Sequence, residues 1–229
     1  MSEGPAVALA LAYGYLVGSI PTAYLTARWV KGIDLRRYGS GNIGASNVAA
    51  HVGKAYFMPV VAFDILVKGA TTVLLARALE LGEGFEVIAG LAAVLGHGWP
   101  LYTRFIGGRA ATTAAGVVLV LAPVELLLCT AVAALGVLPF RSAALWVGIA
   151  VALLPVWTLL LKESAEVLLL SFALVALLAI KRLEANRIKR PQGVPWHLLL
   201  ARRLLHDRDV STREEWIGRT PGAEGDRTR

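Results

Sequence analysis

Residues 114–138 read AAGVVLVLAPVELLLCTAVAALGVL, a run in which Glu125 is the only charged residue. About 20 apolar residues span the hydrocarbon core of a bilayer as a helix, and this run is longer. Pro123 lies inside it, and proline lacks a backbone N–H and clashes with the preceding helical turn. The run therefore predicts either one membrane crossing or two short crossings that meet at Pro123.

The rest of the chain is apolar in the same way. Of its 229 residues, 56% are hydrophobic and 17% are charged, whereas soluble domains are ~45–50% apolar and ~25% charged. Further apolar blocks cover residues 5–30, 55–81, 87–101, 143–161 and 167–180. This composition excludes a disordered chain and predicts helices that span a bilayer. A single cysteine, Cys129, excludes a disulfide scaffold and a metal site built from several cysteines.

The loop charges decide between the two interpretations of the long run. Residues 31–54 form a basic loop and residues 82–86 an acidic turn, and cytoplasmic loops of membrane proteins are basic. Six crossings would leave the basic tail outside the cell, whereas a break at Pro123 returns it to the cytoplasm. We therefore expect an all-α polytopic membrane bundle of about seven transmembrane segments, two of them only ~11–14 residues long. Its N-terminus would lie outside and its C-terminus in the cytoplasm.

Two parts are expected along the chain, a transmembrane domain at residues 1–190 and a basic cytoplasmic tail at residues 191–229. Residues 196–205 are apolar on one side and carry two arginines, as amphipathic helices at membrane surfaces do. The final residues are rich in Gly, Thr and Arg, which predicts disorder. The net charge of +7 follows from basic cytoplasmic loops, so no nucleic-acid partner is expected.

The densest group of polar residues is the stretch RRYGSGNIGASN at residues 36–47. Glycines let backbone N–H groups approach an anion, while hydroxyl and amide side chains add donors. An ordinary loop between helices uses the same residue types, but it needs fewer donors. We interpret the stretch as a phosphate site, with candidate residues Arg37, Gly39, Ser40, Gly41, Asn42 and Asn47.

A second Gly-rich loop, FIGGRAATT at residues 105–113, leads into an apolar helix. Paired glycines, a cation and hydroxyls at a helix N-terminus can hold an anion, although threonines also cap ordinary helices. The candidate phosphate-binding residues here are Gly107, Gly108, Arg109, Thr112 and Thr113.

Asp64, Lys68 and His97 lie inside apolar blocks, where ionisable groups are costly and often functional. Asp64 and Lys68 are four residues apart and can pair on one helix, so a structural ion pair is one interpretation. His97 lies near the end of its block, where it serves either packing or catalysis.

Several of these segments together resemble the bacterial membrane glycerol-3-phosphate acyltransferases that use acyl phosphate as donor. The resemblance covers residues 10–120, and its closest part is residues 39–48. The segments occur in the order of the family, as Gly18-Ser19-Ile20-Pro21, 39–48, Asp64 to Lys68-Gly69, Leu95-Gly96-His97 with Pro100, and 105–113. Family members are seven-crossing bundles with these motif loops on the cytoplasmic side, in agreement with the charge pattern.

The resemblance implies a reaction. The sn-1 hydroxyl of glycerol 3-phosphate attacks a fatty acyl phosphate, giving lysophosphatidic acid and inorganic phosphate for phospholipid synthesis. It implies no cofactor or metal, a location in the cell membrane and a functional link to an enzyme that forms acyl phosphate. An ungapped alignment places Arg182 and Arg187 on arginines of the family's third motif. The implied catalytic residues are Ser40, Asn42, His97 and Arg182, and the implied phosphate-binding residues include Lys68 and Arg187.

The chain also departs from the family pattern. Arg109 stands where the family usually has lysine, Ala50 where it has arginine, and the third motif does not retain both its histidine and its asparagine. These changes leave open a non-catalytic or altered-specificity member that binds phospholipid or acyl phosphate or regulates an active paralogue. A small transporter or channel is a further alternative.

Overall fold

The computed structural model describes residues 3–140, 142–185, 193–210 and 212–221. Within these ranges every element is a helix and none is a strand, which confirms the expected all-α fold. The elements are α1 (Glu3–Gly18), α2 (Thr22–Lys31), η1 (Leu35–Arg37), α3 (Ala45–His51), η2 (Lys54–Tyr56), α4 (Phe57–Ala62), η3 (Phe63–Ala70), α5 (Thr71–Ala78), α6 (Glu83–Gly98), η4 (Leu101–Thr103), α7 (Ala111–Leu121), α8 (Pro123–Phe140), α9 (Ala143–Ala152), α10 (Leu154–Leu160), α11 (Ala165–Glu184), α12 (Trp196–His206) and α13 (Arg213–Ile217).

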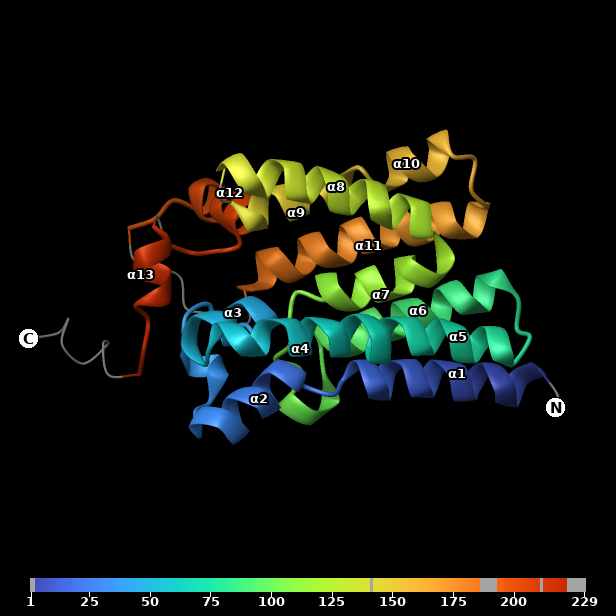
Figure 1. The fold of residues 1–229 in the computed structure, drawn as a ribbon, viewed down its shortest axis with the longest axis horizontal. Coiled ribbons are helices and arrows are strands. Elements are labelled where there is room, and N and C mark those ends of the chain that lie inside the picture. Colours follow the sequence, from blue (N-terminus) through green and yellow to red (C-terminus); the bar gives the residue numbers. More distant parts are fainter. Residues whose placement is uncertain (1–2, 141, 186–192, 211, 222–229) are drawn as a thin grey trace, which may run out of the picture.

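The long helices run side by side along the longest axis of the molecule (Figure 1). In the described part of the chain, five helical stretches are long and apolar enough to cross a membrane, namely Glu3–Lys31, Lys54–Ala78, Glu83–Thr103, Pro123–Phe140 and Ala143–Leu160. Figure 1 shows α7 and α11 lying along the same axis. The count of seven crossings and their direction through the bilayer stay predictions, because length and composition alone select five.

The break expected at Pro123 is present. Helix α7 ends at Leu121, Ala122 has an extended φ of −145°, and α8 starts at Pro123. The expected length of the second segment is wrong, since α8 has 18 residues. It is longer because Pro123 itself begins the helix, where its missing N–H costs nothing, and because the helix continues past the apolar run to Phe140.

Close helix contact brings η3 against α7. A Cβ on Gly116 would collide with the carbonyl oxygen of Ile65, and a Cβ on Gly69 would collide with that of Thr113. Only glycines at these two positions allow the backbones to approach this far. The contact places polar residues of η3 next to the start of α7.

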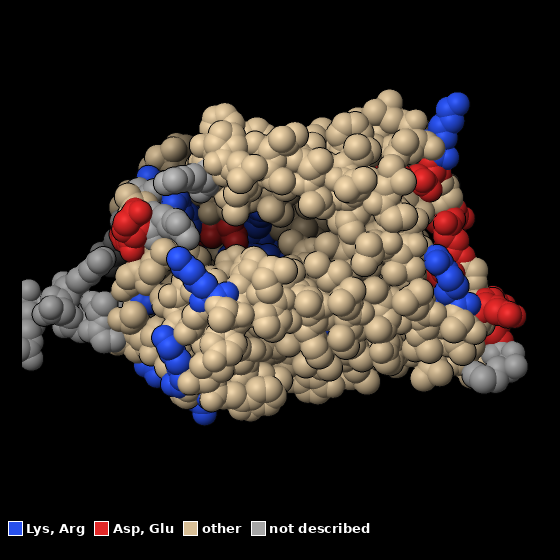
Figure 2. Space-filling model, viewed as in Figure 1, with Lys and Arg blue, Asp and Glu red and all other residues tan. Residues whose placement is uncertain are grey.

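Charged side chains gather at the two ends of the bundle, and a wide uncharged band separates them on the face in Figure 2. Large apolar side chains such as Leu127, Leu135, Leu169 and Phe172 are more than half exposed. Soluble proteins rarely expose so much apolar surface, whereas lipid covers such a band in a membrane. One end is mainly basic and the other mainly acidic (Figure 2).

The described part of the tail lies at the basic end (Figure 1). Arg203 of α12 donates to the carbonyl oxygen of Leu183 at 2.8 Å, and Arg182 donates to that of Leu204 at 2.7 Å. The division at residue 190 stays a prediction, and these bonds tie the tail to α11. The final residues expected to be disordered, 222–229, lie outside the described residues.

Candidate active site

A buried ion pair lies at the centre of the polar network. The segment η3 is a π-helix, a form that is rare and frequent at functional sites. On it, Lys68 Nζ lies 2.7 Å from Asp64 Oδ1, and both side chains are 2% exposed. Thr22 of α2 donates to Asp64 Oδ1 at 2.8 Å, and Thr112 of α7 donates to Oδ2 at 3.0 Å. Each carboxylate oxygen therefore has a partner.

His97 joins this network from the end of α6. Its Nδ1 lies 2.9 Å from the Thr113 hydroxyl and 3.3 Å from Lys68 Nζ. An ammonium can only donate, so we assign Nδ1 as an acceptor and place the ring proton on Nε2. A Cβ on Gly108 would collide with that Nε2, so the second Gly-rich loop lies directly on the imidazole.

The second Gly-rich loop is held on α6 by its backbone. Gly108 N donates to the carbonyl oxygen of His97 at 3.1 Å. Arg104, Phe105 and Ala110 have φ values of +55°, +64° and +61°. Left-handed conformations are uncommon for residues with a Cβ, and such strain clusters at functional sites.

Arg109 links this loop to α11 and to the tail. One of its terminal guanidinium nitrogens donates to the carbonyl oxygen of Lys181. Its Nε lies 2.6 Å from Asp207 Oδ1 in an ion pair whose side chains are 11% and 23% exposed. This cation is therefore more accessible than Lys68.

The first Gly-rich loop is shaped by Asn47. Its Nδ2 donates to three carbonyl oxygens, those of Leu35 at 3.3 Å, Tyr38 at 3.0 Å and Asn42 at 2.9 Å. Left-handed backbone at Gly39 and Gly41, with φ of +55° and +66°, completes the turn. The geometry gives Asn47 the task of holding the loop.

Ser40 is buried within the same loop, and its Oγ accepts from Asn42 N at 3.2 Å. At the start of the loop, Arg36 forms an ion pair with Asp34, and its Nη2 lies 2.6 Å from Asp34 Oδ2. The hydrogen bond from Arg36 lowers the pKa of the Asp34 carboxyl.

Two cavities are lined in part by residues at the start of α7. Arg109 and Ser40 line the polar one, and Ala111, two residues after Arg109, lines the apolar one. The remaining lining of the polar cavity is Ala185, Arg203, Asp207, Arg208, Asp209, Trp216 and Arg219. The apolar cavity also has Ala114, Ala115, Val118, Leu126, Cys129, Val151, Leu154, Leu174 and Leu178. Figure 2 shows a hollow on the front face, towards the basic end, with charged side chains inside.

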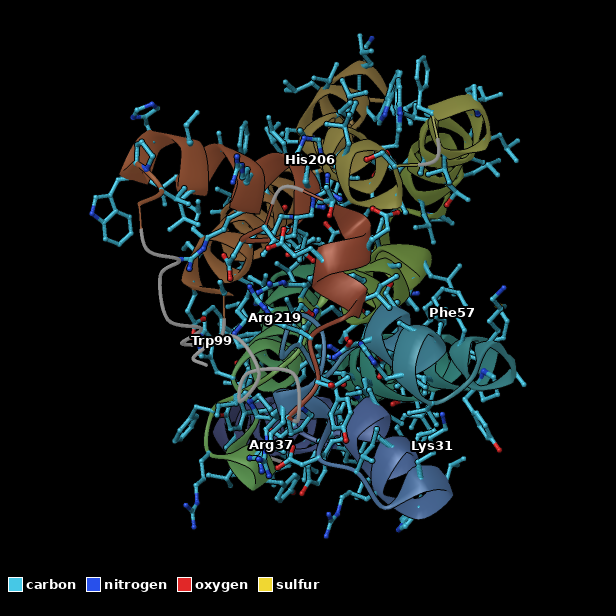
Figure 3. The ribbon with its side chains drawn as sticks, turned by 90° about the vertical axis from the view of Figure 1, so that its left-hand side faces the viewer. Lys31, Arg37, Phe57, Trp99, His206 and Arg219 are labelled. Atoms are coloured by element: carbon cyan, nitrogen blue, oxygen red, sulfur yellow. The ribbon has the colours of Figure 1, made fainter. Side chains whose placement is uncertain are left out.

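The predicted site residues thus fall into distinct places. Lys68, His97, Thr112 and Thr113 share the buried network, whereas Ser40 and Arg109 share the polar cavity. Arg37 is exposed at the basic end seen in Figure 3. Arg182 donates to the carbonyl oxygens of Ala144 and Leu204, both at 2.7 Å. Arg187 lies outside the described residues.

Sequence reasoning missed the tail residues of the polar cavity. The tail's many basic residues were the available signal, but basic loops are ordinary on the cytoplasmic side of membrane proteins. Nothing in the linear sequence places Arg203 or Asp207 near Arg109.

An apolar cavity in a membrane-embedded bundle, next to a polar cavity rich in arginine, defines a class of protein. It suits an integral membrane protein that handles a lipid chain together with an anionic polar group. The chain matches the profile of the family "Glycerol-3-phosphate acyltransferase" over residues 8–191. It belongs to this family, and it is an integral membrane glycerol-3-phosphate acyltransferase of lipid biosynthesis.

Relatives and solved structures agree with this assignment. Glycerol-3-phosphate acyltransferase 4 of Dehalococcoides mccartyi (strain CBDB1) is 39% identical over 225 residues, 96% of each chain. That of Desulforamulus reducens is 41% identical over 75% of this chain and 85% of its own. A crystal structure of the integral membrane acyltransferase PlsY in its glycerol 3-phosphate form has a TM-score of 0.73 and 31% identity, covering 77% of this chain and 88% of that chain. The lysophosphatidic acid form of PlsY has a TM-score of 0.70 and 30% identity, covering 77% of this chain and 87% of that chain.

Proposed function

We propose that the enzyme transfers an acyl group from a fatty acyl phosphate to the sn-1 hydroxyl of glycerol 3-phosphate. The products are lysophosphatidic acid and inorganic phosphate, and the reaction takes place in the cell membrane. The observation that carries the proposal is that Arg109 lines a polar cavity and Ala111, two residues later, lines an apolar one. A donor with its phosphate in the polar cavity and its chain in the apolar one would have its carbonyl carbon near the start of α7.

The chemistry asks little of the protein beyond positioning. The acceptor oxygen forms a bond to the carbonyl carbon, the bond from that carbon to the phosphate oxygen breaks, and phosphate leaves with the electron pair. The hydroxyl proton is taken up by the phosphate group or by solvent. Holding both reactants and neutralising the leaving phosphate are recognised sources of large rate gains.

The residues divide between contact and support in this proposal. Arg109 and Ser40 contact a phosphate or the acceptor in the polar cavity, with Asn42 beside Ser40. His97, which is buried under Gly108, positions the second loop. The Arg182 guanidinium donates hydrogen bonds to two backbone carbonyl oxygens, which favours a positioning role at the end of the bundle.

The remaining predicted residues support the phosphates indirectly in this proposal. Lys68 and the two threonines of α7 fix the start of that helix, and the glycines of both loops admit backbone N–H groups to the anion. Because an acyl phosphate is consumed, an enzyme that forms acyl phosphates must supply the donor.

Product analysis on the purified full-length protein in lipid nanodiscs tests the proposal. Inorganic phosphate release from palmitoyl phosphate is measured with and without glycerol 3-phosphate, and palmitoyl-CoA serves as a competing donor. The proposal expects release that depends on glycerol 3-phosphate, with 1-palmitoyl lysophosphatidate formed. Transfer from palmitoyl-CoA alone would overturn the donor, and a 2-acyl product would overturn the acceptor position.

A further inference from the structure

The polar cavity is built mainly by a segment beyond the family match. The match ends at residue 191, and six of the nine residues lining the cavity come from later positions, namely Arg203, Asp207, Arg208, Asp209, Trp216 and Arg219. Figure 3 shows α13 crossing the middle of the basic end, with Arg219 near its centre. The relative from strain CBDB1 aligns with 96% of this chain, so the alignment takes in most of the tail.

The charges of the lining suit a phosphate. The cavity is lined by four arginines, Arg109, Arg203, Arg208 and Arg219, and by two aspartates, Asp207 and Asp209. Four positive charges against two negative ones leave the lining with a net charge of about +2. Arginine matches phosphate and carboxylate oxygens with paired N–H donors. A phosphate dianion would balance the lining.

Each of the two aspartates forms an ion pair with one of the arginines. Asp207 Oδ1 lies 2.6 Å from Arg109 Nε, and Asp209 Oδ1 lies 2.6 Å from Arg203 Nε. Arg208 Nε and Trp216 Nε1 are buried and have no hydrogen-bond partner in the described part of the chain. Buried donors without acceptors are rare, and a bound phosphate would supply the acceptors.

The tail residues that line the polar cavity are hydrogen-bonded to the first Gly-rich loop and to α11. Gly39 N, next to Ser40, donates to the carbonyl oxygen of Arg219 at 3.0 Å, and Arg203 is anchored on Leu183 at the end of α11. Asp207 follows α12 directly and has a left-handed φ of +52°. Its side chain is 23% exposed, so it can leave Arg109 while the backbone ties stay in place.

We propose that the tail completes the phosphate site and that Asp207 acts as an internal stand-in for the substrate phosphate. Asp207 holds the Arg109 guanidinium while the cavity is empty, and it yields that guanidinium when a phosphate group enters. Exchanging one anion for another avoids leaving a guanidinium that is only 11% exposed without a counterion, a state that proteins disfavour. Arg208 then supplies a further donor to the same phosphate. This inference rests on the proposed function.

Binding of inorganic phosphate to the full-length protein, measured by calorimetry in nanodiscs, tests the inference without turnover. Asp207→Asn removes the internal competitor, so phosphate binding tightens by about two- to fivefold. Arg208→Gln removes a charged donor, so binding weakens roughly 10- to 100-fold.

Matched controls distinguish a direct effect of the cavity residues on phosphate affinity from the effect of the tail's overall charge. Glu214 on α13 is exposed, and neither it nor Arg202 on α12 lines the cavity. Glu214→Gln and Arg202→Gln should change the affinity by less than about twofold at physiological salt. Weaker or unchanged binding in folded Asp207→Asn would overturn the inference. If that variant does not fold, unchanged binding in Arg208→Gln would overturn it.

Steady-state kinetics identify which phosphate uses the site. A higher KM of Arg208→Gln for glycerol 3-phosphate assigns the acceptor, and a higher KM for palmitoyl phosphate assigns the donor. If neither KM changes in an active enzyme, the site serves no substrate and the inference fails. If no variant or wild-type protein transfers acyl groups, the proposed function fails, while phosphate binding still decides the present inference.

Discussion

Two ion pairs near the start of α7 differ in what surrounds them. Asp64 and Lys68 are almost fully buried, and Thr22, Thr112 and His97 complete their hydrogen bonds. Arg109 and Asp207 are partly exposed and line a cavity. A pair that is closed on all sides serves as a framework, whereas a pair at a cavity can exchange one partner for a ligand.

The largest expected effect comes from breaking the buried pair. Asp64→Asn leaves the Lys68 ammonium buried without its counterion, so the free energy of unfolding should fall by ~3–5 kcal/mol. Denaturant unfolding in detergent micelles measures this. The double variant with Lys68→Gln should recover part of the loss, because it removes the unpaired charge. A loss below ~1 kcal/mol in the single variant would contradict a framework role.

Crowding the contact between the second loop and His97 should have the next largest effect. Gly108→Ala places a methyl group against His97 Nε2, and overpacking of this kind costs ~1–3 kcal/mol. Thermal unfolding and acyl transfer should both suffer. Gly84→Ala is the matched control, because its Cβ would meet nothing closer than Glu166 Cγ at 4.0 Å. Equal behaviour of the two variants would show that the loop does not depend on this contact.

Removing the exchangeable cation should affect catalysis more than stability. Arg109→Gln should lower kcat/KM for acyl transfer roughly 10- to 100-fold, with a change of only ~1 kcal/mol in the free energy of unfolding. Arg104→Gln serves as the control, since Arg104 is exposed directly before the same loop and does not line the cavity. Loss of stability without loss of activity would reverse the roles assigned to the two pairs.

The smallest effect is expected at the first loop, where Asp34 pairs with Arg36. Arg36 holds the pKa of Asp34 below its ordinary value of 3.8. The pair therefore stabilises the fold above pH 3.8, and this contribution is lost as the pH falls towards the lowered pKa. Melting temperatures of the wild type and Asp34→Asn should differ slightly at neutral pH and converge in acid. A gap that widens in acid would contradict this sign.

The all-helical membrane bundle could be predicted from sequence because apolar runs and proline act locally. Pro123 marked the break between α7 and α8 correctly. The length of α8 could not be predicted from the apolar run alone, since Pro123 itself begins the helix and the helix continues beyond the run to Phe140. Helix ends depend on what the flanking residues contact as well as on hydropathy.

The site could be predicted only in part. The spacing of Asp64 and Lys68 indicated that they could pair, and the two Gly-rich loops indicated anion sites. The partners Thr22 and His97 come from other helices, and the close approach of Gly69 to α7 that assembles them is a tertiary feature. Asp207 of the tail, which pairs with Arg109, is about 100 residues away from it in sequence. A local sequence pattern does not predict a contact over that separation.

The most direct test of the account is a structure of the full chain in nanodiscs with glycerol 3-phosphate and, separately, with a non-hydrolysable acyl phosphonate. We expect the anionic group of one ligand to contact the Arg109 guanidinium and Asp207 to have moved away from it. The Asp64–Lys68 pair should remain unchanged. Both ligands bound elsewhere, with Arg109 and Asp207 still 2.6 Å apart, would contradict it.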